Sequence, residues 1–166
     1  MEARIKVLRA RIKAWSWIFI IGLFISGLTG IPLEFELELL NEWIGKGTSF
    51  ESTWPAMSAW ISYCYDSIHE IGEKYPFIYY GTDWLSFGHF VIGISLFGVL
   101  RDPIRNIWIV EYCMIACVLV VPFALIFGAY RDIPLFWSLI DCSFGVFGII
   151  PLILVRSHIK ELESLL

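Results

Sequence analysis

The sequence has few charged residues and lacks the short motifs that identify the common enzyme classes. Charged residues make up 17% of its 166 residues, against about 25% in a typical soluble domain. There is no H-E-x-x-H metal motif, no G-x-S-x-G nucleophile motif and no glycine-rich phosphate loop. The sequence therefore indicates no catalytic residue and no cofactor, and it leaves open whether the protein is an enzyme.

Cysteine and histidine are too sparse for the usual redox and metal sites. The four cysteines contain no C-x-x-C pair, so neither a dithiol motif nor a disulfide framework is indicated. Of the three histidines only His89 lies in a long apolar run, which excludes a haem held by two histidines inside a membrane. A metal bound by His69, His89 and Asp141 would require the segment 32–83 to fold over the apolar runs, and we predict no metal site.

Long apolar runs are abundant. Hydrophobic residues make up 58% of the chain, and four runs come close to the roughly 20 residues that a helix needs to cross a bilayer. Because backbone amides in lipid must be satisfied within the segment, such runs predict helices and not barrel strands. We predict an all-α, integral membrane four-helix bundle that forms one membrane domain over residues 1–166. The predicted spans are 14–31, 84–100, 107–127 and 135–155.

The distribution of basic residues predicts the orientation. Five of them lie in residues 1–13, whereas the segment 32–83 has two lysines and nine acidic residues. Because Lys and Arg favour the cytoplasmic side, we expect both termini in the cytoplasm and residues 32–83 outside. The first run opens on Trp15 and Trp17 and lacks an A-x-A-like site, so we expect a retained span and not a cleaved signal. The net charge of −4 argues against nucleic acid as a partner, and membrane lipids are the expected one.

The segment 32–83 contains two amphipathic patterns. Pro32 and Gly45 are typical of the start and stop of a first helix, although the alternation over 34–39 also fits a strand. A second, more regular pattern begins near Thr53, with Pro55 early in its first turn, and ends before Gly72. We expect an extracytoplasmic two-helix cap over the helix ends, in preference to two helices lying on the bilayer surface. Such a cap offers a contact for a second copy of the chain or for a membrane-protein partner.

Three of the apolar runs contain an ionisable residue: His89, Glu111 and Asp141. An ionisable group in hydrocarbon costs about 2.5 kcal/mol or more, so it normally faces other helices, water or a ligand. At about 1.5 Å per residue, His89 and Asp141 lie roughly 8–9 Å below the outer boundary, and Glu111 lies roughly 6 Å from the cytoplasmic one. Depth therefore separates an outer pair from an inner carboxylate.

The outer pair is our candidate for a ligand-binding pocket. His89 and Asp141 lie on faces rich in glycine, which allow helices to approach closely. Arg131 and Tyr130 follow the third run, where they reach the rim of such a pocket. Glu111 is instead predicted to form a structural ion pair with one of three arginines at its own depth, Arg101, Arg105 or Arg156.

Three functions remain open at this stage. The leading hypothesis is a protein whose outward-facing pocket at His89 and Asp141 binds, or helps translocate, a small polar or lipid-like ligand. The first alternative is a membrane enzyme that uses the two side chains as an acid–base pair on a lipid or quinone-like substrate. The second alternative is a structural subunit or assembly factor that recruits a partner through the cap.

Two stretches carry a resemblance. RDPIRNIW at 101–108 and RDIPLFWSLIDCSFGVFGIIPL at 131–152 resemble segments of small uncharacterised bacterial four-span inner-membrane proteins. The resemblance implies a location in a bacterial plasma membrane. It brings no activity, cofactor or catalytic residue.

Overall fold

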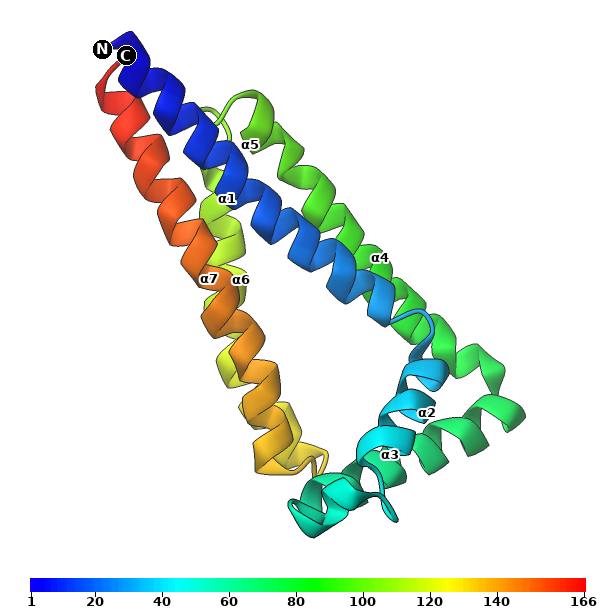
Figure 1. Cartoon of the computed structure of the whole chain (residues 1–166). Coiled ribbons are helices and arrows are strands. Elements are labelled where there is room, and N and C mark those ends of the chain that lie inside the picture. Colours follow the sequence, from blue (N-terminus) through cyan, green and yellow to red (C-terminus); the bar gives the residue numbers. More distant parts are fainter. The chain divides into compact units, whose positions relative to one another are not determined.

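The computed structural model describes all 166 residues; 86% of them are helical and none forms a strand. This confirms the predicted all-α fold. The chain divides into two compact units, one formed by Met1–Leu23 with Val91–Leu166 and the other by Phe24–Phe90. In chain order the elements are α1 (Glu2–Thr29), α2 (Leu33–Ile44), η1 (Ser49–Ser52), α3 (Pro55–Lys74), η2 (Pro76–Tyr79), α4 (Tyr80–Ser95), α5 (Phe97–Arg101), α6 (Ile107–Tyr130) and α7 (Leu135–Ser164) (Figure 1).

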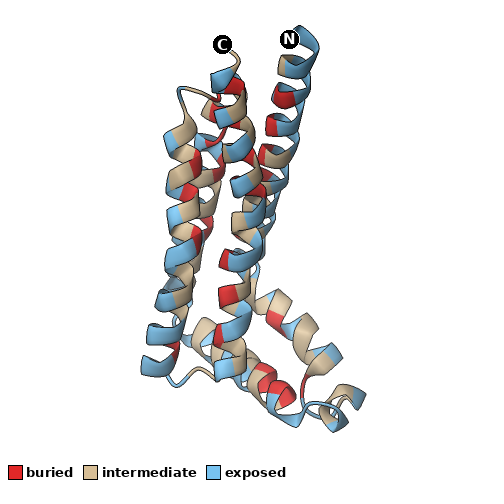
Figure 2. Ribbon diagram, turned by 90° about the vertical axis from the view of Figure 1, so that its left-hand side faces the viewer, coloured by how far each residue is buried: buried red, intermediate tan, exposed pale blue.

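Four helical segments are long and apolar enough to cross a membrane: Glu2–Thr29, Pro76–Arg101, Ile107–Tyr130 and Leu135–Ser164. Exposed residues run along all of these helices (Figure 2). Only 17% of the most apolar 18-residue stretch of α6 is buried within the chain. A helix that is apolar on its exposed side as well is compatible with lipid around it. Three predicted spans lie inside these segments, whereas the first, 14–31, extends two residues beyond Thr29.

The first unit is built around α6 and α7, which pair along their length after a four-residue turn at 131–134. The α7 backbone lies close to that of α6 at Gly145, where an added Cβ would overlap the backbone carbonyl oxygen of Cys117. Gly145 therefore sets the spacing of the two helices because any side chain there would push the α6 backbone away. The largest fully buried side chains of this pair are Val110, Cys113, Leu152, Val155, Ile159 and Leu162.

Most of α1, as far as Leu23, belongs to the same unit. This helix begins at Glu2, well before the predicted span, so the basic residues of the N-terminus lie on the helix itself. Leu8 and Ile12 are buried, and Arg4 forms an ion pair with Glu161 near the end of α7. The rings of Trp17 and Phe97 are 5.7 Å apart and connect α1 with α5. The two ends of the chain are thereby held together.

The second unit contains the helical hairpin of α2 and α3. The helix over residues 33–44 shows that the alternative strand over 34–39 is wrong; Leu37 is buried while the glutamates around it are not. The second helix, α3, begins at Pro55, two residues after the predicted start near Thr53, and continues two residues past Gly72. The hairpin is fastened by Ser62, whose hydroxyl donates to Oδ1 of Asn41 at 2.6 Å and accepts the backbone N–H of Lys46 at 2.9 Å.

Candidate functional site

The turn between α6 and α7 fixes the position of Arg131, which was predicted to lie at the rim of the pocket. The N–H of Ile133 donates to the carbonyl of Gly128 at 2.9 Å, and Asp132 has a φ of 56°. Together with the Asp132 N–H, which points to the Ala129 carbonyl at 3.4 Å, these bonds form a Schellman motif that ends α6. The motif fixes Arg131 at the end of the helix, with its guanidinium carbon 5.2 Å from the ring centre of Tyr130.

Arg131 and Asp141 line one groove on the α6–α7 pair, with a volume of about 540 Å³. The two predicted binding residues thus meet within a single unit, while Tyr130 contacts Arg131 and does not line the groove. The remaining lining residues are apolar or small and come mainly from α6: Ala116, Leu119, Val120, Phe123, Ala124, Phe127, Gly128 and Ile133.

Asp141 is the unusual member of this groove. Its side chain is half-buried, and it takes part in no hydrogen bond or ion pair within the chain. It lies one turn before Gly145, where α7 packs closely on the α6 backbone. A carboxylate in apolar surroundings without a partner favours a donor or a cation from outside the chain.

His89 belongs to the second unit, so its predicted pairing with Asp141 stays a prediction. Within its own unit the ring Nδ1 lies 2.8 Å from the carbonyl oxygen of Leu85, one turn earlier in α4. Across from it, an added Cβ at Gly27 would come within 3.1 Å of the His89 Cβ. The bond at Nδ1 leaves Nε2 as the ring atom available to a ligand.

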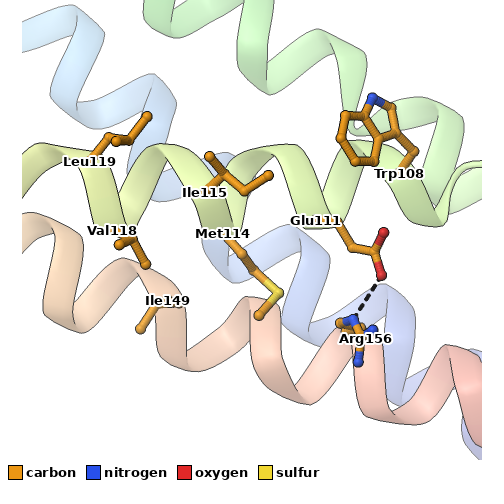
Figure 3. Close-up of a pocket in the computed structure, with 8 residues that line it drawn as sticks. All are labelled: Trp108, Glu111, Met114, Ile115, Val118, Leu119, Ile149 and Arg156. Carbon is orange, nitrogen blue, oxygen red and sulfur yellow. Dashed lines mark hydrogen bonds and ion pairs between the residues drawn. The ribbon is translucent and has the colours of Figure 1, made fainter.

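Glu111 forms an ion pair with Arg156, one of the three arginines named for it. Nε of Arg156 donates to Oε1 of Glu111 at 2.8 Å, linking α6 to α7 (Figure 3). Arg105 instead lies 3.5 Å from Asp102 within its own turn, and Arg101 is exposed. In contrast to Asp141, this carboxylate has its charge partner inside the chain.

A polar cluster in the second unit was missed by the sequence analysis. Nδ1 of His69 lies 2.6 Å from Oε1 of Glu34, and the Tyr79 hydroxyl donates to Oε2 of the same carboxylate at 3.0 Å. The hydroxyl is shared with the Ile68 carbonyl, 2.9 Å away. These contacts join α2, α3 and η2 through side chains 35 and 45 residues apart. The only sequence signal was the predicted pairing of two helices.

The hydrogen bond between His69 and Glu34 shifts the pKa of both side chains. It lowers the pKa of Glu34 below the ordinary 4.5, helped by the hydrogen bond from Tyr79. The same bond raises the pKa of His69 above the ordinary 6.5. Both side chains are exposed, so the cluster is an ion pair in water and not a desolvated acid–base site.

Neither unit brings three His, Cys, Asp or Glu side chains together in a group that could hold a metal. No protein-family model, curated protein or solved structure matches the chain. The function of the protein is therefore inferred from the geometry described above.

Proposed function

We propose that this chain is a multi-pass membrane protein that binds a small polar or lipid-like ligand in the groove lined by Arg131 and Asp141. The observation that carries the proposal is the half-buried Asp141 carboxylate, which has no partner in the chain and lies in a groove of apolar side chains. A group of this kind is costly in lipid, so it is normally retained only where it serves a function.

The composition of the groove supports an amphiphile. Its walls include Leu119, Phe123 and Phe127, which suit a hydrocarbon chain, and its charged residues are Arg131 and Asp141. A volume of about 540 Å³ falls in the usual range for small-molecule sites. The best ligand therefore has an apolar body and a polar head that carries a hydrogen-bond donor or an ammonium for Asp141 and an acceptor for Arg131.

The membrane and its orientation are part of the proposal. We place the protein in a bacterial plasma membrane with both termini in the cytoplasm, supported by the five basic residues before the first apolar run. In that orientation Asp141 opens to the outside, and the pairing of His89 with Asp141 stays a prediction that His89→Ala tests. Residues 32–83 then form the extracytoplasmic cap.

A second candidate function has an observation of its own. Phe35 and Trp43 of α2 are 63% and 66% exposed among the acidic residues Glu34, Glu38 and Glu42. Exposed aromatic residues at an interface centre often dominate binding. A structural subunit that recruits a membrane-protein partner through α2 would use this face, and the double variant Phe35→Ala with Trp43→Ala would then lose the co-purifying partner.

The test of the leading proposal is mass spectrometry of the small molecules and lipids retained by detergent-purified protein. The wild type is expected to retain an amphiphile that is lost in Asp141→Asn and Arg131→Gln and reduced in His89→Ala. The matched control is Asp132→Asn, an exposed acid in the adjacent turn. Identical retention by all four variants would contradict the proposal.

A further inference from the structure

The other end of the α6–α7 pair carries a second groove, of about 480 Å³, beside the Glu111–Arg156 ion pair. In Figure 3 the two charged side chains and Trp108 lie toward one end of the groove, and apolar side chains extend from there along α6. The apolar residues are Met114, Ile115, Val118, Leu119 and Ile149. We propose that this groove binds an anionic phospholipid of the bilayer, with its phosphate held by Arg156.

The hydrogen bonding of Arg156 supports a phosphate. A guanidinium has five N–H donors in a planar fork that matches phosphate oxygens. Only Nε is used within the chain, on Oε1 of Glu111. The side chain is 43% exposed, so the remaining donors are accessible beside the groove. The ion pair thus orients Arg156 without consuming its capacity to bind an anion.

The charge around Arg156 selects the sign of the ligand. The N-terminal half of α1 contributes Lys6, Arg9 and Arg11 in the same unit, whereas Lys160, one helical turn beyond Arg156, is paired with Glu163 at 3.0 Å. Arg4 is joined directly to α7 through Glu161. Clusters of basic side chains beside an apolar helix attract anionic lipid headgroups. A zwitterionic lipid gains less from this field.

The apolar part of the groove selects a lipid over free phosphate. Its walls are apolar, as an acyl chain requires, and Trp108 is 64% exposed at the charged end. Tryptophan prefers the boundary between headgroups and hydrocarbon. Leu119 lines both this groove and the one at Arg131, so the chain of the bound lipid ends where the other groove begins.

Replacing Glu111 and replacing Arg156 should change the retention of anionic lipid in opposite directions. Glu111 orients Arg156 but also repels a phosphate, so its neutral amide would remove this repulsion and bind the guanidinium less strongly. We expect Glu111→Gln to increase the retention of anionic lipid several-fold, whereas Arg156→Gln lowers it about tenfold, the size of a lost charge-assisted hydrogen bond. A purely structural ion pair would make both variants less stable and change lipid preference in neither.

The experiment is native mass spectrometry of the full-length protein in detergent with added dioleoyl phosphatidylglycerol or dioleoyl phosphatidylcholine. The wild type is expected to prefer phosphatidylglycerol, and the control Arg105→Gln, at a highly exposed arginine that does not line the groove, is expected to keep that preference. An unchanged lipid ratio in Glu111→Gln and Arg156→Gln, or an equal loss in Arg105→Gln, would overturn the proposal. If Arg156→Gln does not fold, Arg156→Lys and Glu111→Gln provide the test.

Asp141→Asn and Arg131→Gln are expected to leave the lipid ratio unchanged, which separates this site from the proposed function.

Discussion

The two ends of the α6–α7 pair contain the same kinds of charged group in opposite conditions. At one end Glu111 is paired with Arg156 at 2.8 Å. At the other end Asp141 and Arg131 line one groove, yet Asp141 has no partner in the chain. The difference shows that an ionisable residue in an apolar run is not by itself a functional signal. What distinguishes the two carboxylates is whether the chain supplies their counter-charge.

The largest effect is expected at Gly145, because the grooves at both ends of the α6–α7 pair depend on the packing of these two helices. Gly145→Val would place side-chain atoms on the Cys117 carbonyl, a backbone group that cannot rotate away. We expect a loss of about 3 kcal/mol in unfolding free energy, at the upper end of overpacking costs. Thermal unfolding in detergent measures it. The control is Gly22→Ala in α1, where an added Cβ meets nothing within 4 Å; an equal loss there would show that Gly145 is not the special contact.

The comparison itself is tested by neutralising each carboxylate in delipidated protein. Glu111→Gln removes the charge from a half-exposed pair and should lower the unfolding free energy by about 1 kcal/mol. Asp141→Asn removes an unpaired carboxylate and should leave that energy unchanged or raise it by up to about 1 kcal/mol. Only Glu111→Gln should therefore lower the melting temperature. Equal losses would mean that Asp141 also has a partner.

A smaller effect is expected in the turn that positions Arg131. Asp132 has a φ of 56°, in the left-handed region that glycine adopts without a steric cost. Asp132→Gly should raise the unfolding free energy by up to about 1 kcal/mol, because it relieves this cost. Ligand retention at Arg131 should not change. A decrease in stability would show that the Asp132 side chain contributes more than its backbone conformation.

The smallest effect concerns the exposed pair of the second unit, which serves as a reference in water. The raised pKa of His69 makes its contribution complete below the unfolded value near 6.5 and lost as the pH rises through the higher folded value. The lowered pKa of Glu34 makes its contribution complete above about 4.5 and lost as the pH falls through the lower folded value. NMR titration should therefore show His69 above, and Glu34 below, its ordinary pKa.

Replacing the histidine tests the same pair. His69→Asn should abolish the pH dependence of stability that this pair contributes as the pH rises above the unfolded value near 6.5. A titration of His69 at its ordinary value would contradict the hydrogen bond to Glu34.

The helices were predictable because their signals are local. Four continuous apolar runs identified the candidate spans, and Pro55 marked the first turn of α3. The partner of Glu111 was not predictable from depth alone, since three arginines share that level. Arg105 is held by Asp102 in its own turn, and only the pairing of α6 with α7 brings Arg156 to Glu111. Contacts of this kind depend on helix register, which a single sequence does not specify.

The same reason explains the cluster that was missed. Glu34, His69 and Tyr79 come from three elements, and none lies at a spacing that suggests the others. The groove at Asp141 was only partly predictable. Residue type and depth indicated Asp141 and Arg131, whereas the aromatic wall from Phe123 and Phe127 requires the packed helix pair.

The most direct test of the unpaired carboxylate is labelling of the purified protein in detergent with N,N′-dicyclohexylcarbodiimide, an apolar reagent for carboxyl groups, followed by peptide mass spectrometry. Asp141 should be modified well before Glu111, and adding back the retained amphiphile should protect it. Modification of Glu111 at the same rate as Asp141, or no modification of Asp141, would contradict the claim that the chain leaves this carboxylate free for a ligand.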